Sequence, residues 1–229
     1  KTMEIVAAGA HNILLQGPPG SGKSMLLNRL PSILPPLTHQ ECVDIIKLQN
    51  LNVNTGIQDS FIKRPFRTPH HSISHIGLAG GGKKPLPGEI SLANNGILFL
   101  DELPEFSRQA LEVLRQPLES KKITITRASQ SISYPANFLL TAAMNPCPCG
   151  YSTDTIVECT CTEYEKNKYL KKLSGPLLDR FDIIIEIPRL NKDDYTSQKS
   201  SNQNSLSMKE NVKKAICLQK NRYKSNEKN

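Results

Sequence analysis

The sequence predicts a three-layer αβα domain with a parallel central sheet, and three observations support this fold class. Short apolar runs bounded by turn residues recur along the chain, such as Ile13-Leu14-Leu15 and Ile97-Leu98-Phe99-Leu100. Runs of this kind are typical of central parallel strands that are buried on both faces. Segments with helical periodicity lie between them, and a glycine-rich loop joins the first strand to the first of those helices. Strands that alternate with helices build a sheet covered on both sides.

The expected elements follow one another in a regular order. Strands are expected at residues 13–15, 97–100, 138–145 and 183–187, with helices at 24–30 and at 107–118, the latter capped by Ser107. Two segments interrupt this alternation. Residues 61–91 are rich in Gly, Pro, His and Lys, which predicts an inserted surface loop or hairpin. Residues 123–134 alternate in polarity around a central turn, which predicts a β-hairpin.

The domain organisation is expected to be simple. Residues 1–190 form the α/β core, and the composition then changes to Asn, Lys, Ser and Gln, so residues 191–206 are expected to be a linker or a disordered loop. An amphipathic helix is expected at about residues 206–223. The first residue is not Met and the chain opens within a helical pattern, so we expect a fragment of a longer protein.

Composition limits the classes of function. The chain has 229 residues, enough for one domain with an ordinary core, and a formal net charge of +8. A positive excess favours partners that carry phosphate, but many of these bases lie in the C-terminal tail and are equally consistent with a solvated helix face. An aromatic content of 5% without Trp argues against a surface that stacks on single-stranded bases. Without a long apolar run or a leader pattern, the chain is expected to be cytoplasmic and not to contact a membrane.

A phosphate-binding loop is the strongest motif. Its eight residues match the pattern G-x-x-x-x-G-K-[ST] between a strand and a helix, which is the context that this motif requires: Gly17, Pro18, Pro19, Gly20, Ser21, Gly22, Lys23 and Ser24. The glycines let backbone N–H groups turn inward around a phosphate, and the helix N-terminus adds partial positive charge. In such a loop Lys23 neutralises the β- and γ-phosphates of a nucleotide such as ATP, and the Ser24 hydroxyl binds Mg²⁺.

Two carboxylates follow a second buried run. Asp101 and Glu102 come directly after Ile97-Leu98-Phe99-Leu100, so the strand brings Asp101 to its carboxyl end, where an acid can hold Mg²⁺. Glu102 points elsewhere and can polarise the water that attacks the γ-phosphate. An acidic pair after a strand is commonplace by itself, and the phosphate loop is what favours the catalytic interpretation.

Two further residues are candidates for the same site. Asn145 ends the next buried strand, and the tips of neighbouring parallel strands lie together, so its amide can orient the water or the γ-phosphate; an Asn before Pro146 is also an ordinary turn former. Arg180 lies where a short helix meets the last strand, and a guanidinium there can stabilise charge in the transition state. The alternative for Arg180 is a salt bridge with Asp179 or Asp182.

Four cysteines follow Asn145 in one polar loop as two C-x-C pairs. Cys147, Cys149, Cys159 and Cys161 are a candidate tetrahedral Zn²⁺ site, although C-x-x-C is the more usual spacing. The alternative is a set of reduced loop thiols. His70 and His71 are expected to serve the structure of the insert or to make polar contacts.

Several of these segments resemble one protein family, over about residues 4–189. They are Arg67-Thr68-Pro69-His70-His71-Ser72, Phe99-Leu100-Asp101-Glu102-Leu103-Pro104-Glu105-Phe106 and Asn145-Pro146-Cys147-Pro148-Cys149-Gly150. They resemble the Mg-chelatase-like branch of the AAA+ ATPases, most closely the bacterial ComM (YifB) family.

The resemblance implies a role for each motif. It makes residues 17–24 Walker A, Asp101 and Glu102 Walker B, Asn145 sensor 1 and Arg180 an arginine finger that acts on a neighbouring subunit. Residues 61–91 become a helix-2 insert and residues 123–134 a pre-sensor-1 hairpin. In related rings such loops contact DNA. Five basic residues are therefore candidates for contacts with DNA phosphates: Lys83, Lys84, Lys121, Lys122 and Arg127. Residues 207–229 become the start of a truncated C-terminal helical lid.

The function implied by the resemblance is an ATP-hydrolysing motor, a homo-oligomeric and hexameric ring that acts on DNA as a branch-migration helicase does. A magnesium-chelatase ATPase subunit that drives metal insertion is the alternative within the same family. A scaffold without hydrolysis that binds zinc or nucleic acid is a third interpretation, and the intact Lys23, Asp101 and Glu102 argue against it.

Overall fold

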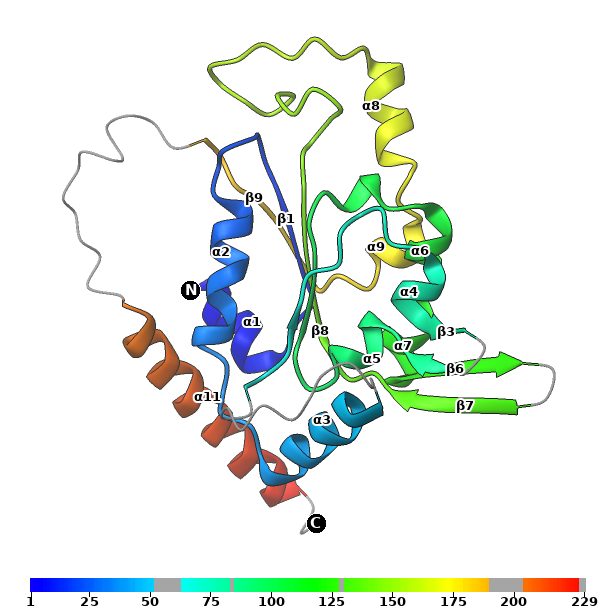
Figure 1. The fold of residues 1–229 in the computed structure, drawn as a ribbon. Coiled ribbons are helices and arrows are strands. Elements are labelled where there is room, and N and C mark those ends of the chain that lie inside the picture. The colour runs from blue at the N-terminus through cyan, green and yellow to red at the C-terminus, as the bar shows by residue number, and fades with distance from the viewer. Residues whose placement is uncertain (52–62, 83–84, 128–129, 190–203, 227–229) are drawn as a thin grey trace.

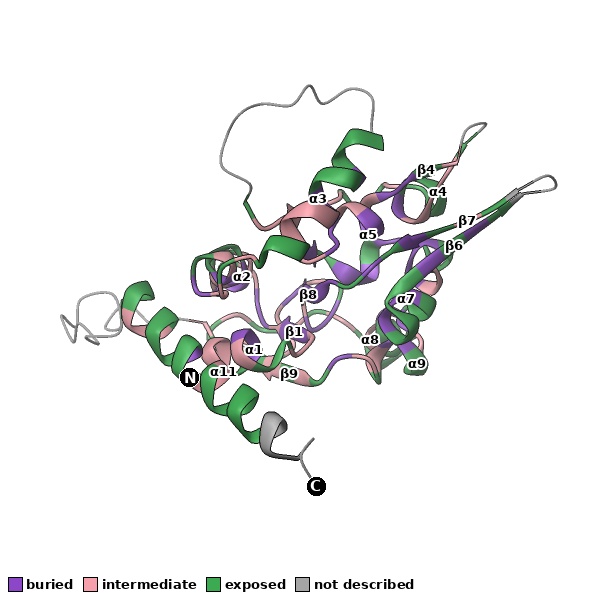
Figure 2. Cartoon of the chain, turned by 90° about the horizontal axis from the view of Figure 1, so that it is seen from below, coloured by how far each residue is buried: buried purple, intermediate pink, exposed green. Residues whose placement is uncertain are grey.

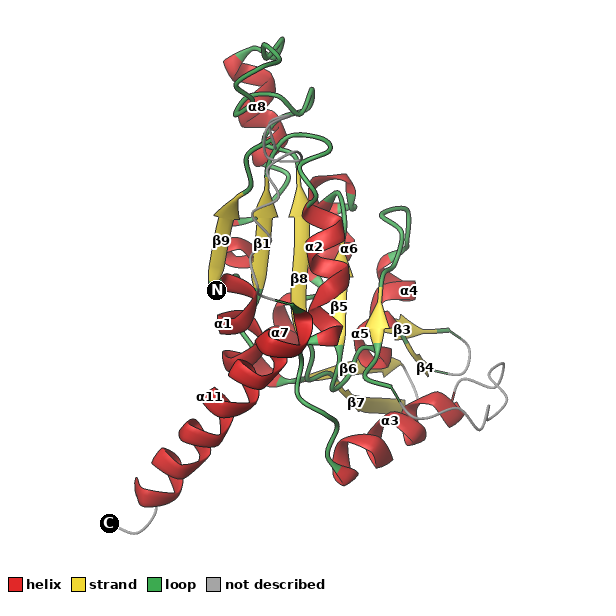
Figure 3. Ribbon diagram, turned by 90° about the vertical axis from the view of Figure 1, so that its left-hand side faces the viewer, coloured by secondary structure: helices red, strands yellow, loops and turns green. Residues whose placement is uncertain are grey.

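The central sheet determines where the candidate active-site residues lie. The computed structural model describes residues 1–51, 63–82, 85–127, 130–189 and 204–226. Within these, five strands form one sheet in the order β2-β5-β8-β1-β9, and every neighbouring pair is parallel. Figure 3 shows the strands side by side with their carboxyl ends at the same edge. Their bounds are Ile13–Gln16 (β1), Phe66–Arg67 (β2), Ile97–Leu100 (β5), Leu139–Met144 (β8) and Ile183–Glu186 (β9).

Helices cover both faces of this sheet (Figure 1). The α-helices are α1 (Thr2–Gly9), α2 (Lys23–Arg29), α3 (His39–Leu51), α4 (His75–Ala79), α5 (Glu89–Leu92), α6 (Arg108–Glu112), α7 (Arg115–Ser120), α8 (Glu163–Leu170), α9 (Gly175–Leu178) and α11 (Ser205–Asn226). Two 3₁₀ turns, η1 (Leu30–Ser32) and η2 (Leu103–Glu105), complete the helical elements of the described residues.

Alternation along the strands divides the core in two. Leu14 of β1 packs in a cluster with α5, α6 and α7, whereas its neighbours Ile13 and Leu15 pack in a second cluster with α1, α2 and α11. Successive side chains of a strand point to opposite faces, so one apolar run supplies both clusters. Figure 2 shows the buried residues concentrated on the sheet and on the inner faces of the helices. The predicted three-layer α/β architecture is therefore confirmed.

Two predicted elements were wrong in detail. The helix expected at residues 107–118 is broken into α6 and α7. Ser107 does cap α6, since its hydroxyl accepts the Ala110 N–H at 3.2 Å. Pro117 explains the break, because proline has no N–H and its ring collides with the carbonyl four residues earlier, which belongs to Val113.

The last strand is not a central one. β9 lies at the edge of the sheet and its exposure alternates; the Ile184 side chain is 54% exposed. Three consecutive isoleucines suggested burial on both faces, but apolar content alone does not distinguish an edge strand from a central one.

The first insertion is smaller than expected. Phe66 and Arg67 are not part of a surface loop but form β2, which pairs with β5 at the other edge of the central sheet. The rest of the segment contains α4, α5 and a two-stranded hairpin of β3 (Gly80–Gly81) and β4 (Leu86–Pro87). Lys83 and Lys84 lie outside the described residues.

The second insertion is the predicted hairpin. β6 (Lys122–Arg127) and β7 (Gln130–Pro135) pair antiparallel, from Lys122 opposite Pro135 to Arg127 opposite Gln130. Figure 1 shows that this hairpin extends away from the body of the domain. Its base is anchored in the core by Ile123, Ile125 and Tyr134.

The C-terminal helix packs on the first helix. Residues 191–203 of the predicted linker lie outside the described residues, and α11 begins at Ser205. Val212 of α11 is buried in the second core cluster, and the Asn211 amide donates to Glu4 of α1 at 2.8 Å. In the part of the chain that the structure describes, no helix is both long and apolar enough to cross a membrane.

Candidate active site

Backbone geometry explains the glycines of the phosphate loop. Gly20 and Gly22 have φ of 76° and 85°, the left-handed region that favours glycine. Gly17 is required for a different reason, because a Cβ there would lie 2.1 Å from the carbonyl oxygen of Ile187, the residue that follows β9. The loop leaves β1 at Gln16 and enters α2 at Lys23, so it curls over the carboxyl edge of the sheet as the sequence predicts.

Lys23 points back into the loop. Its side chain is 8% exposed, and Nζ donates to the carbonyl oxygens of Gly17 at 2.8 Å and Pro18 at 2.9 Å. Burial lowers the pKa of Lys23, and the charge of Asp101 partly opposes that effect. The hydroxyl of Ser21 is buried in the same loop without a hydrogen-bond partner among the described residues. A buried ammonium and an unpartnered hydroxyl fit an anion such as a nucleotide phosphate.

The two predicted magnesium ligands are in contact. The Ser24 hydroxyl donates to Asp101 Oδ2 at 2.7 Å, although the residues come from different elements, α2 and the end of β5. Asp101 Oδ1 accepts the backbone N–H of Glu102 at 3.0 Å, which fixes the carboxylate. A hydroxyl and a carboxylate oxygen are hard donors of the kind that Mg²⁺ binds next to a nucleotide phosphate. The donor set therefore fits this ion.

Glu102 adopts an unusual backbone conformation. Its φ is 53°, the left-handed region, which costs a non-glycine residue on the order of 1 kcal/mol or more. The side chain is 60% exposed, and one oxygen lies 3.2 Å from Nδ1 of His71.

His71 is a residue of this site that the sequence did not assign to it. It follows β2. Its ring packs edge-on against Phe106, with the ring centroids 6.4 Å apart, and lies tilted against His70, with the centroids 4.0 Å apart. The expectation of polar contacts for this segment is correct, but the partner could not be foreseen. The sequence did not predict the strand β2, and it is β2 that places residues 68–71 next to the end of β5 and so brings His71 to Glu102.

A cavity of about 410 Å³ lies between these elements. It adjoins Ser24 and both acids, and residues 68–71 form its opposite wall. The candidate Mg²⁺ ligands and the candidate base therefore face a common space.

Asn145 lies beside the phosphate loop as predicted. It follows β8, and its Oδ1 is 3.3 Å from Lys23 Nζ. Tyr169 of α8 interacts with the backbone of Asn145, and burial raises the pKa of this tyrosine to about 12. Asn145 is thus held both by the loop and by the helix that follows the cysteines.

Arg180 is not brought to the phosphate loop of its own chain. It precedes β9, at the amino ends of the strands, whereas the loop lies at their carboxyl ends. Its guanidinium forms an ion pair with Glu119 of α7, and Nε is buried without a partner among the described residues. The alternative pairing with Asp179 or Asp182 is wrong, and Asp182 instead accepts the backbone N–H of Asn12 at 2.7 Å.

The four cysteines do come together. Their sulfur atoms all lie within 4.8 Å of one another, and no disulfide joins any of them. They form a separate group in the loop between Asn145 and α8.

Known proteins are similar to this chain in sequence. A family model described as magnesium chelatase, subunit ChlI, matches residues 1–195. YifB of Salmonella typhimurium is 46% identical over 226 residues, which is 99% of this chain and 44% of that protein. Competence protein ComM of Haemophilus influenzae is 46% identical over 222 residues, 97% of this chain and 43% of that protein.

A more distant relative is the magnesium-chelatase subunit ChlI of Porphyra purpurea, 26% identical over 156 residues, 58% of this chain and 44% of that protein. The chain spans less than half the length of each of these relatives. The family match and the five-stranded parallel sheet together confirm the predicted AAA+ type of α/β domain. The chain therefore belongs to the Mg-chelatase family of AAA+ proteins, where it groups with ComM and YifB.

Proposed function

We propose that this chain is the ATPase core of a ring-forming motor that acts on DNA. The observation that carries the ATPase part is the contact between Ser24 and Asp101 beside the buried Lys23. Two elements far apart in the sequence bring together there a hydroxyl and a carboxylate, the donor types that a Mg²⁺-nucleotide complex requires. The Mg-chelatase family is a family of AAA+ ATPases, which agrees with this geometry.

Each residue of the site has a separate role in ATP hydrolysis. On nucleotide binding, Lys23 exchanges the carbonyls of Gly17 and Pro18 for the β- and γ-phosphates. Mg²⁺, held by Ser24 and Asp101, would supply charge neutralisation at the phosphates. Glu102 accepts the proton of the attacking water, and Asn145 orients that water or the γ-phosphate. Zinc at the cysteines would be a structural metal without a part in this chemistry.

The hairpins support an action on DNA. Lys121 and Lys122 are exposed at the start of the extended β6–β7 hairpin, and Arg127 is close to its tip. A net charge of +8 favours contact with a phosphate backbone. A hexameric ring would bring six such hairpins around a central channel and would place Arg180 of one subunit against the site of the next.

The test is the ATPase rate of the full-length protein with and without forked or four-way DNA. We expect DNA to raise the rate in the wild type but not in Glu102→Gln. Replacing both Lys121 and Lys122 by Ala is expected to reduce the stimulation while leaving the DNA-free rate unchanged. Stimulation only by a chelatase partner with a porphyrin would favour the magnesium-chelatase alternative, which the similarity to ChlI of Porphyra purpurea supports.

His71 is expected to act as a positioning residue for Glu102. In His71→Ala the carboxylate loses the imidazole that lies 3.2 Å away and holds it in position, so kcat should fall by about tenfold, within the range for a displaced catalytic group. KM for ATP should change little, because His71 contacts no residue of the phosphate loop. His71→Gln retains a donor and should recover part of the loss. His75→Ala, an exposed histidine of the same insertion, is the control; a rise in KM with unchanged kcat would contradict the assignment.

A further inference from the structure

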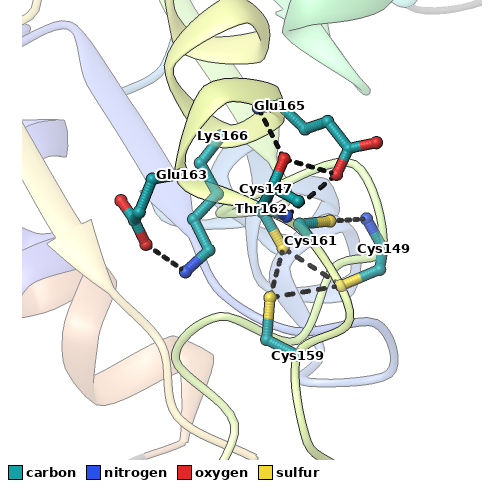
Figure 4. A network of polar contacts seen from close by, with 8 residues as sticks. All are labelled: Cys147, Cys149, Cys159, Cys161, Thr162, Glu163, Glu165 and Lys166. Carbon is teal, nitrogen blue, oxygen red and sulfur yellow. Dashed lines mark hydrogen bonds and ion pairs between the residues drawn. The ribbon is translucent and has the colours of Figure 1, made fainter.

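The loop between Asn145 and α8 gathers four thiols that the phosphate chemistry does not use. Cys147, Cys149, Cys159 and Cys161 are named here the cysteine cluster. Their sulfur atoms point toward one another from two short segments of the loop (Figure 4). Cys147 is buried and the other three are partly exposed, so the cluster lies at the surface with one ligand in the interior.

The distances fit a metal site and not disulfides. Sγ of Cys147 lies 3.3 Å from that of Cys149 and 3.8 Å from that of Cys159, and the Cys149–Cys159 separation is 3.5 Å. A disulfide requires about 2.05 Å. Four sulfurs around one Zn²⁺ at about 2.3 Å form a tetrahedron with edges of about 3.8 Å. The cluster is therefore close to the size of a tetrathiolate zinc site.

Neighbouring groups suit the negative charge of such a site. The backbone N–H of Cys149 donates to Sγ of Cys161 at 3.3 Å, a contact that stabilises a thiolate. Lys166, paired with Glu163 at 2.8 Å, interacts electrostatically with Cys159 and Cys147. Figure 4 shows this lysine on α8 beside the cluster.

The loop that carries the cysteine cluster also packs against the phosphate loop. Cys147 is two residues from Asn145, whose amide contacts Lys23. Gly150 packs closely against the phosphate loop, because a Cβ added to Gly150 would lie 2.8 Å from ring atoms of Pro19. At its other end the loop enters α8, through a capping box formed by Thr162 and Glu165. Tyr169 of α8 in turn interacts with the backbone of Asn145.

We propose that the cysteine cluster binds one Zn²⁺ as a structural site and thereby holds Asn145 and the phosphate loop in place. Zinc closes the loop by joining its two C-x-C pairs. One end of the closed loop begins two residues after Asn145, and the other end leads into α8, whose Tyr169 interacts with the Asn145 backbone. The ion contributes order, not reactivity, because four thiolates leave no open coordination position for water or substrate.

The metal is tested directly on the full-length wild-type protein purified under reducing conditions without added metal. We expect about one zinc per chain by elemental analysis, released on titration of the thiols with a mercurial. Co²⁺ exchanged into the protein should show the intense visible and thiolate charge-transfer bands of a tetrahedral sulfur site. Absence of metal, iron in place of zinc, or octahedral cobalt spectra would overturn the proposal. None of these readouts depends on ATP hydrolysis, so they remain valid if the proposed function fails.

Variants test the link to the phosphate loop. The double variant with Cys149→Ser and Cys159→Ser is expected to lose zinc and to bind a fluorescent ATP analogue several-fold more weakly. The matched control replaces Cys42 and Cys217, which lie on α3 and α11, and should keep both zinc and affinity. Zinc retained in the first variant would refute the ligand assignment, and unchanged affinity after zinc loss would refute the structural link.

Discussion

Glu102→Gln is expected to abolish most ATP hydrolysis while leaving ATP bound. A positioned general base contributes about 10² to 10⁴ in rate, and glutamine cannot accept a proton, so kcat should fall by that factor. Glu102 contacts His71 and not Lys23 or Ser24, which is why nucleotide affinity should be retained. Single-turnover hydrolysis together with the Kd for ATP measures both parts of the expectation.

A nearby acid supplies the control for this prediction. Glu105 belongs to the same segment, but it pairs with Lys172 at the surface at 3.3 Å. Glu105→Gln should therefore hydrolyse ATP at close to the wild-type rate. Full activity in Glu102→Gln, or a loss of ATP binding equal to the loss of rate, would show that Glu102 is not the base.

The arrangement of the candidate phosphate site was predictable from the sequence because its signals are local. A glycine-rich loop between an apolar run and a helix has one common use, and the carboxyl ends of parallel strands meet at one edge. Those two rules place Lys23, Asp101 and Asn145 together, and the contacts of Lys23 confirm the placement. The meeting of the four cysteines was predictable in the same way, since they share one loop.

Other parts of the site depend on contacts that no local pattern records. β2 has two residues, too few for a periodicity, so its place beside β5 and the resulting approach of His71 to Glu102 could not be foreseen. The same holds for Arg180, whose carboxylate partner, Glu119, is distant in sequence. Neighbouring Asp179 and Asp182 were the natural candidates from the sequence, but short separation along the chain does not guarantee a favourable direction of the side chains.

Arg180→Ala is expected to produce the largest defect, about 10³ to 10⁵ in the hydrolysis rate of the assembled protein, the range for an arginine supplied by a neighbouring subunit. The position of Arg180 supports an action on a neighbour. It precedes β9, whereas the phosphate loop follows β1, which is parallel to β9. The 4 residues of β1 therefore separate the amino ends of the strands from their carboxyl ends by about 13 Å, at 3.3 Å per residue. The guanidinium, paired with Glu119, therefore lies at the opposite end of the strands from the loop of its own chain.

Mixing experiments distinguish a neighbour's arginine from a structural one. Arg180→Ala and Glu102→Gln chains should each be inactive alone, but a mixed ring should regain activity. In that ring a Glu102→Gln subunit donates its intact Arg180 to a site that retains Glu102 in the next subunit. Glu119→Ala removes the same ion pair but keeps the arginine, so it should remain active and control for the loss of that contact. If mixing restores nothing while Glu119→Ala is equally inactive, Arg180 stabilises the fold through Glu119 and does not complete a neighbouring site.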